Sequence, residues 1–318
     1  MLRIRREEPA PGSPMQSSQR LARMAPCDGC GRSKVVSVMK LVGVDGCRAG
    51  WVVASSEVAG AGTPSLSDLS FSVERSFRGL LDSLQGQRAL VAVDIPIGLP
   101  SGAPLDGGRR RADAEARTFL GPRRAPSVFS APCRATLAAK SYREACDLEV
   151  QARGAVKGLS QQAYHIIPKI REIDTVVRPA DQEPIDGSVR VWIREVHPEV
   201  TFARLAPEQR GLDHPKRGCK VCRTNRCTDF DRRLDLLRTY VPSFDPTAER
   251  QRLLRAFRER AASPDVPTLK GIPLGRDDVV DAVACLVTAL RIVAGDALTL
   301  PAREPAYDAR GLRMEIVA

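Results

Sequence analysis

The amino-acid sequence predicts an α/β fold in which a mixed β-sheet is flanked by helices. Three observations support this fold class. Strand-like segments with apolar residues occur early in the chain, at 41–45, 51–54 and 70–74. A near-continuous apolar run at 89–94 indicates a strand that is buried on both faces. Helical periodicity is clearest near the end of the chain, at 277–293.

The first strands are expected to form a meander. The segment 41–45 ends in an acid, and 51–54 follows after a glycine-flanked turn as its hairpin partner. Apolar and polar residues alternate at 70–74, which predicts a third strand, whereas 77–84 carries apolar residues at helical spacing. The buried strand at 89–94 then completes the first half of the sheet.

The second half begins with a polar, helical segment at about 101–185, which we interpret as an insertion. The elements expected here and beyond are helices at 110–120 and 159–177, a strand at 189–193, a short helix from 202, helices at 228–241, 247–261 and 277–293, and a strand at 312–317. The ribonuclease H-like fold, a mixed-sheet α/β architecture, has a characteristic order of elements. This order is three strands in a meander, a helix, a buried strand, another strand and a late helix, and the predicted elements follow it.

Composition and length bound the domain organisation. The chain has 318 residues, of which 43% are hydrophobic, so a globular core is expected. Residues 1–38 are rich in Pro, Ser, Gln and Arg and lack apolar periodicity, which predicts a disordered extension before a domain at 39–318. No apolar run approaches the length of a membrane span, and no secretory signal follows the basic first residues, so the default expectation is a cytoplasmic protein without a membrane partner.

Positive charge is concentrated in two segments. The formal net charge is +11, and the segments 109–124 and 216–238 hold six and eight basic residues against two and three acidic ones. Such patches favour a polyanionic partner such as nucleic acid, and the alternative is a solvated basic surface. Aromatic residues make up only 4% of the chain, which argues against a base-stacking platform for single strands.

Acidic residues stand where two predicted strands end. Asp45 ends the first strand and Asp94 ends the buried one. Ligands of open α/β sheets bind outside the carboxyl ends of strands, so neighbouring parallel strands would bring both carboxylates into one crevice. Two uncompensated anions would repel each other, and hard carboxylate oxygens are the ligands that Mg²⁺ or Mn²⁺ prefers. The sequence therefore predicts a divalent-metal site at this edge of the sheet.

The late helix and one further strand end supply additional acids. Asp278 and Asp281 are three residues apart and lie on one helix face, so both are expected metal ligands. Asp277 is open to a plainer interpretation as a helix cap. Glu195 ends another strand and is a further candidate catalytic acid, while a structural role is favoured for His197. Two metal ions about 3.5–4 Å apart would activate a water and stabilise the leaving oxygen of a phosphodiester.

Several motifs together resemble the domain of unknown function 429 family. They are Gly43-Val44-Asp45-Gly46-Cys47-Arg48-Ala49-Gly50-Trp51, Val93-Asp94-Ile95-Pro96-Ile97-Gly98-Leu99, Ser127-Val128-Phe129, Lys157-Gly158-Leu159-Ser160-Gln161-Gln162, Glu195-Val196-His197-Pro198-Glu199, Asp277-Asp278-Val279-Val280-Asp281-Ala282 and Gly311-Leu312-Arg313-Met314. The resemblance covers roughly 41–318, and it implies a predicted nuclease of ribonuclease H fold. The Asp-x-x-Asp-Ala helix also resembles the terminal helix of Holliday-junction resolvases.

One segment departs from that family pattern. The Cys- and Arg-rich loop at 214–227 contains a complete four-ligand set for zinc, and the alternative interpretation is a reduced, solvated loop. The candidate zinc ligands are His214, Cys219, Cys222 and Cys227.

Polar residues of the insertion are the candidate substrate contacts. In a nuclease, such side chains would contact phosphates and set the orientation of the strand, although Arg111 and Arg117 could instead pair with acids of their own helix. The candidates are Arg111, Arg117, Lys157, Gln161 and Lys169.

The sequence thus favours a metal-dependent nuclease or phosphodiesterase that acts on nucleic acid. Two other functions stay open. A phosphotransferase or ATPase would share the core fold, but two duplicated halves with Gly-rich phosphate loops are missing. A non-catalytic nucleic-acid-binding protein is the other possibility, and it would keep the acids for stability alone. The fold does not decide between these functions.

Overall fold

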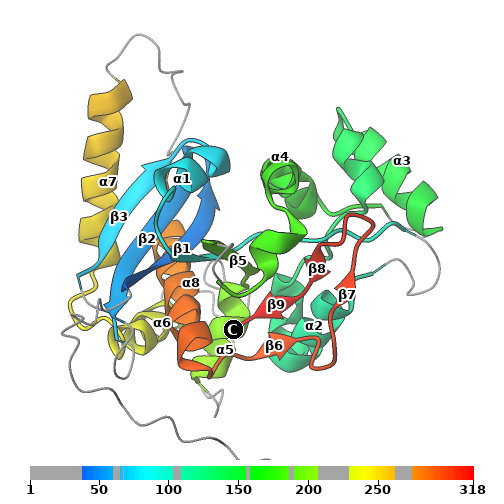
Figure 1. Cartoon of the computed structure of the whole chain (residues 1–318). Coiled ribbons are helices and arrows are strands. Elements are labelled where there is room, and N and C mark those ends of the chain that lie inside the picture. Colours follow the sequence, from blue (N-terminus) through cyan, green and yellow to red (C-terminus); the bar gives the residue numbers. More distant parts are fainter. Residues whose placement is uncertain are drawn as a thin grey trace, which may run out of the picture. The chain divides into compact units, whose positions relative to one another are not determined.

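The computed structural model describes residues 38–59, 65–66, 68–102, 109–154, 158–185, 190–206, 229–261 and 274–318 (Figure 1). Two predicted segments lie outside these residues. They are the disordered extension, apart from its last residue Val38, and the zinc loop at 214–227 with its four candidate ligands. The candidate substrate residue Lys157 also lies outside them.

A five-stranded mixed sheet forms the centre of the fold, as the sequence predicts (Figure 1). Its strands are β1 (Val38–Cys47), β2 (Gly50–Ala59), β3 (Ser70–Glu74), β4 (Ala89–Val93) and β5 (Val191–Glu195), in the spatial order β3-β2-β1-β4-β5. The β1, β2 and β3 meander is antiparallel, whereas β4 runs parallel to both β1 and β5. Every residue of β4 is buried, which confirms that the apolar run is a central strand.

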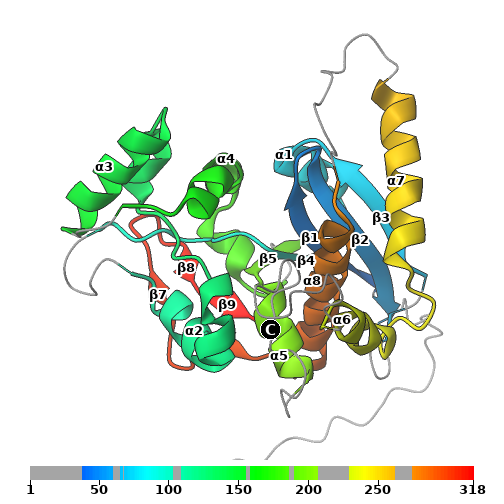
Figure 2. The same ribbon diagram turned by 180° about the vertical axis from the view of Figure 1, so that it is seen from behind.

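One face of the sheet is covered by the late helix α8 (Arg276–Ala294) (Figure 2). Leu41 and Val52 belong to the core on this side, together with residues of α6 (Asp229–Arg238) and α7 (Pro246–Ala261). The approach of α8 depends on Gly43 in β1, where a Cβ atom would overlap the backbone of Ala282 and Leu286. The missing side chain therefore lets α8 lie directly on the strand.

The opposite face is covered by α1 (Phe77–Ser83) and α4 (Gln161–Val176). Side chains of β1 alternate between the two cores because successive residues of a strand point to opposite faces, and Val42 and Val44 therefore lie on the α1 and α4 side. Trp51 of β2 and Phe77 of α1 pack edge to face there, with ring centroids 5.4 Å apart.

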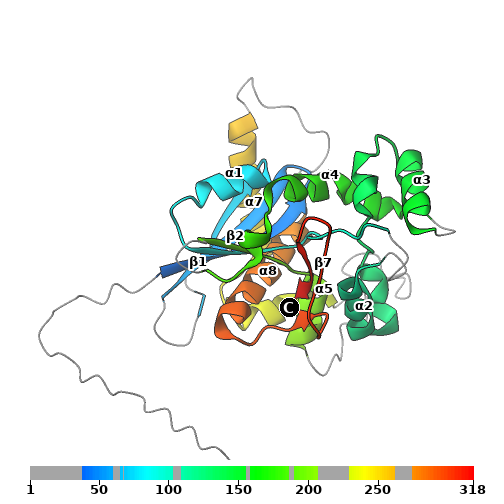
Figure 3. The same cartoon turned by 45° about the vertical axis from the view of Figure 1, so that its right-hand side comes forward.

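Three helices occupy the segment between β4 and β5 (Figure 3). They are α2 (Arg111–Arg124), α3 (Tyr142–Arg153) and α4, and 3₁₀ turns lie at Ala125–Ser127, Arg134–Ala138 and Pro179–Gln182. The sequence predicted α2 and α4 but not α3. This helix buries only Ala145 and Glu149, so its apolar periodicity is weak and its limits are set by the Ser141 cap and the left-handed Gly154.

After β5 the chain forms α5 (Pro198–Leu205), which begins four residues earlier than expected because Pro198 occupies its first turn. The predicted strand at 312–317 is wrong as a single element. It is divided into β8 (Arg313–Met314), paired with β7 (Ala306–Tyr307), and β9 (Ile316–Val317), paired with β6 (Thr299–Leu300). Glu315 stands between β8 and β9, where its buried carboxylate pairs with Arg194 at 2.6 Å.

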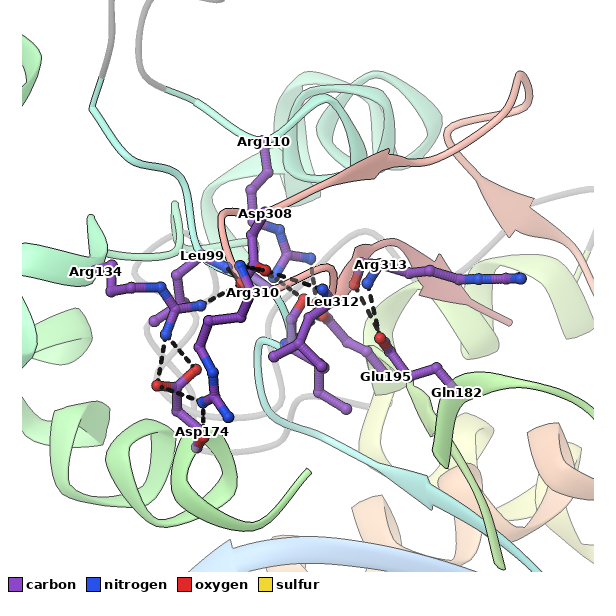
Figure 4. A network of polar contacts seen from close by, with 12 residues as sticks. Leu99, Arg110, Arg134, Asp174, Gln182, Glu195, Asp308, Arg310, Leu312 and Arg313 are labelled. Atoms are coloured by element: carbon purple, nitrogen blue, oxygen red, sulfur yellow. Dashed lines mark hydrogen bonds and ion pairs between the residues drawn. The ribbon is translucent and has the colours of Figure 1, made fainter. Parts of the chain in front are cut away.

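A polar network holds this C-terminal segment against the centre of the fold (Figure 4). The Asp308 carboxylate accepts hydrogen bonds from the backbone amides of Leu99 and Leu312 and pairs with Arg134. Arg134 also binds Asp174 of α4 at 2.5 Å. The network therefore ties the loop after β4, the helical segment and the chain end together. Among the described residues, none of the helices is long and apolar enough to cross a membrane.

Candidate active site

The two acids predicted at strand ends lie on the face of the sheet that α8 covers, although β1 continues two residues beyond Asp45, to Cys47. Asp45 is two residues beyond Gly43, the residue on which α8 packs, so its side chain points to the same face. Asp94 follows β4 and continues the ladder, since its backbone amide donates to the Val44 carbonyl at 2.9 Å. Asp45 is 9% exposed and Asp94 is half-buried. The expected parallel pairing of β1 and β4 is confirmed.

Asp281 of α8 lines the same cavity as Asp45 and Asp94. This cavity has a volume of about 280 Å³, and Asp281 is half-buried beside it. The contact of Gly43 with α8 explains the convergence, because Asp281 immediately precedes the helix residue that lies on Gly43. We name this space the carboxylate cavity; its lining comprises Asp45, Gly46, Asp94, Ile95, Pro96, Ser127, Phe129, Ile166, Lys169, His197, Pro198, Glu199 and Asp281.

Asp278 has a different position from the one predicted. Its carboxylate accepts a hydrogen bond from the Gly275 backbone amide at 2.7 Å, which caps the N-terminus of α8. Asp277 and Asp278 line a second cavity of about 980 Å³ and not the carboxylate cavity. Residues three apart share a helix face, but Asp278 lies in the first turn of α8, where its carboxylate turns back to the Gly275 amide and lines the basic side of the helix start, whereas Asp281 lines the carboxylate cavity.

Basic side chains surround this second, larger space, which we name the basic cavity. Besides Lys169, its lining includes Arg48, His165, Arg250 and Arg276, with Asp277 and Asp278 as the acids. Arg276 is exposed, and its guanidinium lies 3.9 Å from the ring centroid of Phe230. Gly46, Ile166 and Lys169 line both cavities, so the two spaces adjoin.

Lys169 of α4 therefore lies between the carboxylate cavity and the basic cavity. Its ammonium lies 4.4 Å from the Trp51 ring centroid and 3.7 Å from the Glu172 carboxylate. Burial lowers the pKa of Lys169, and the charges of Glu172, Cys47 and Asp45 oppose that change. A cation here can reach a ligand in either cavity.

Glu195 does not belong to the carboxylate cavity. In the parallel pair of β4 and β5, Glu195 is the partner of Val93, so both side chains point to the face opposite Asp94. The Glu195 carboxylate accepts hydrogen bonds from the Ile97 amide and from Arg110, each at 2.6 Å (Figure 4). Burial raises the pKa of Glu195, and the positive charge of Arg110 opposes that rise. This acid supports the loop after β4.

The remaining candidate substrate residues lie away from both cavities. Arg111 is exposed and lies 3.6 Å from Glu115, one helical turn along α2. Arg117 donates two hydrogen bonds to the Val128 carbonyl, at 3.0 and 2.7 Å. Gln161 is exposed at the first turn of α4. Of the substrate candidates in the described ranges, Lys169 is the one that lines a cavity.

His197 and Glu199 are cavity residues that sequence reasoning did not select. His197 precedes α5, and its Nε2 lies 3.3 Å from the Ser127 carbonyl, whereas its buried Nδ1 has no hydrogen-bond partner. Glu199 pairs with Arg124 and Arg233 in the buried first turn of α5. The His-Pro-Glu sequence at a strand-to-helix junction was the available signal, because such junctions at the carboxyl end of a sheet carry ligand-binding residues.

The donor chemistry of the carboxylate cavity fits a hard divalent cation. Asp45, Asp94 and Asp281 offer carboxylate oxygens, which Mg²⁺ and Mn²⁺ prefer. Across the residues that the structure describes, no three His, Cys, Asp or Glu side chains are grouped closely enough to hold a metal ion. Mg²⁺ commonly keeps several waters and binds through one or two carboxylates plus substrate phosphates, so a pair of these acids satisfies its requirement.

The fold and cavities define an α/β protein with a carboxylate-lined space beside a basic one. The sequence profile of one family, described as protein of unknown function (DUF429), matches residues 43–306. The chain therefore belongs to this family, and the matched segment contains every acid of the carboxylate cavity. No curated protein and no solved structure matches the chain significantly.

Proposed function

We propose that this protein is a divalent-metal-dependent nuclease or phosphodiesterase that acts on nucleic acid. The observation that carries the proposal is the adjacency of the carboxylate cavity and the basic cavity, with Lys169 lining both. A phosphodiester substrate needs both environments, because its backbone is a polyanion while cleavage requires a site for a hard cation.

The order of strands in the sheet supports a ribonuclease H-like fold as part of this proposal. The three-stranded antiparallel meander is extended by two parallel strands on the β1 side, and α8 covers the sheet with its N-terminal turns beside the ends of β1 and β4. That arrangement places Asp45, Asp94 and Asp281 in one cavity although the sequence separates them widely.

The roles of the side chains follow from their positions. Two of the acids Asp45, Asp94 and Asp281, together with waters and a substrate phosphate, would hold Mg²⁺ or Mn²⁺. The ion would supply Lewis-acid stabilisation of charge on the phosphate and would lower the pKa of a bound water. Lys169 would neutralise a phosphate oxygen between the two cavities. Arg48, Arg250 and the rest of the basic cavity would contact the flanking phosphates and orient the strand.

The direct test is cleavage of single-stranded and duplex oligonucleotides with Mg²⁺ or Mn²⁺. Asp94→Asn and Asp45→Asn keep the side-chain size but remove the charge that holds the ion, so each is expected to lower the rate at least about a hundredfold. Asp235→Asn is the matched control, because the side chain of Asp235 is 71% exposed and pairs only loosely with Arg238 at 3.4 Å. Cleavage that persists in chelator, or that survives both cavity substitutions, would refute the mechanism.

A further inference from the structure

An exposed aromatic ring lies at the carboxylate cavity. Phe129 lines this cavity and keeps 38% of its surface exposed. Large hydrophobic residues that are this exposed are few among the described residues, namely Val38, Phe129 and Tyr307. Of these, Phe129 is the one that shares a cavity with Asp45 and Asp94.

The backbone on both sides of Phe129 is held firmly. On one side, Val128 is 2% exposed and its carbonyl accepts two hydrogen bonds from Arg117. On the other side, the buried Ala131 donates to Asp113 at 2.9 Å and accepts from Arg153 at 2.6 Å. The exposure of the ring is therefore a property of an anchored segment, because the neighbouring residues have fixed positions.

We propose that Phe129 stacks on a base of the strand whose phosphate enters the carboxylate cavity, so that the substrate is a nucleic acid with an unpaired base at that position. An exposed phenyl face contributes binding free energy when a flat ring covers it, and base stacking on aromatic side chains is tolerant of sequence. This inference rests on the proposed function, and it names the substrate class of the same site.

The unpaired state follows from geometry. Inside a duplex each base is covered on both faces by its neighbours, so a protein ring can stack on it only at the cost of breaking that stacking. Single strands and loops offer such bases without that cost. Two sources share this chemistry, a single strand and a nucleotide flipped out of a duplex, and the experiment below separates them.

The structure limits the contact to one base. The carboxylate cavity has a volume of about 280 Å³, just below the range of roughly 300–1,000 Å³ typical of small-molecule sites. Phe129 is also the one Phe, Tyr or Trp residue in its lining. The low aromatic content of the chain thus argues against a platform for many bases and is compatible with a single stacked base.

The test separates base contacts from phosphate contacts by using two short oligonucleotides of equal length. One carries thymine at every position, and the other is an abasic strand with the same sugar-phosphate backbone. Binding is measured with the full chain in Ca²⁺, which makes the result independent of cleavage. Phe129→Ala should weaken binding of the thymine strand by about 5-fold to 150-fold and leave the abasic strand unchanged.

Two further variants control the interpretation. Phe129→Trp keeps an aromatic face and should retain thymine-strand affinity, whereas Tyr307→Ala removes a more exposed ring outside the cavity lining and should change neither affinity. Wild-type protein should bind the thymine strand more tightly than a blunt duplex. If a duplex with one unpaired base binds as tightly as the thymine strand, a nucleotide flipped out of a duplex also supplies the stacked base. Equal losses for the thymine and abasic strands with Phe129→Ala would overturn the stacking proposal.

The outcomes for stacking and for cleavage are distinguishable. If Phe129→Ala leaves binding of both strands unchanged while Asp94→Asn abolishes metal-dependent cleavage, stacking is refuted and the proposed function stands. If the thymine-specific loss occurs but no cleavage is found with any metal, the chain is a binding protein for unpaired bases and the proposed function fails.

Discussion

Asp94 and Glu195 end neighbouring parallel strands, but their side chains point to opposite faces of the sheet. The register pairs Val93 with Glu195, and because paired residues of parallel strands share a face, Asp94 belongs to the other one. Asp94 therefore lines the carboxylate cavity, while Glu195 binds Arg110 in the interior. Two acids that look equivalent in the sequence have different roles for this reason.

Substitution of Glu195 should affect stability much more than metal chemistry. Glu195→Ala leaves the fully buried Arg110 with one ion-pair partner among the described residues, Asp113 at 3.3 Å, and should lower the free energy of unfolding by about 3–5 kcal/mol. Glu195→Gln keeps an acceptor for the Ile97 amide and should lower the free energy of unfolding by less than Glu195→Ala does. Urea unfolding measures both effects. Loss of cleavage by Glu195→Gln at an unchanged melting temperature would instead place Glu195 in the reaction.

Substitution of Gly43 should destabilise the protein strongly. Gly43→Ala places a Cβ atom against the backbone of Ala282 and Leu286, which cannot move aside as a flexible side chain could. We expect the free energy of unfolding to fall by about 3 kcal/mol or more. Metal binding should also weaken, because α8 carries Asp281. Calorimetry with and without Mn²⁺ measures both. Gly86→Ala is the control. A Cβ atom at Gly86 has free space, but the φ of +77° is unfavourable for alanine, so the free energy of unfolding should fall by only about 1–2 kcal/mol. Equal melting temperatures for the two variants would contradict this packing argument.

Lys169 and Arg111 should differ in their contribution to nucleic-acid binding. Lys169 lines both cavities, whereas Arg111 is exposed on α2 beside Glu115. Lys169→Met should lower the slope of log K against log salt concentration by about 0.7–0.9, the value for one phosphate contact. Arg111→Met should leave the slope unchanged. Titrations of an oligonucleotide at several salt concentrations measure the slopes. Equal slopes for wild type and Lys169→Met would show that Lys169 does not contact a phosphate.

Cys47 should react slowly with alkylating reagents. Burial, followed by the negative charge of Asp278, raises the pKa of Cys47 from 9.0 to about 12. Because the thiolate is the nucleophile, its reactive fraction at pH 8 falls by about three orders of magnitude. Asp278→Asn removes one cause of the rise and should accelerate labelling. Mass spectrometry of the Cys47 peptide, with the half-buried Cys146 as internal reference, measures the rate, and labelling of Cys47 as fast as Cys146 would contradict the prediction.

The sequence by itself determined the elements that rest on local pattern. The apolar run of β4, the hairpin of β1 and β2 and the periodicity of α8 are all properties of consecutive residues, and the structure confirms them. The acids at strand ends were likewise visible, because an acid after an apolar run marks the edge of a sheet.

Only the tertiary structure decided which of these residues meet. The register of β4 and β5 turned Glu195 away from Asp94, and the start of α8 made Asp278 a cap. The buried Glu315 stands between the two short strands that replace the predicted last strand, and the anchored segment around Phe129 leaves one ring exposed beside the carboxylates. Periodicity along the chain defines faces within one element, but relations between elements depend on register and close packing, which arise only when distant segments fold together.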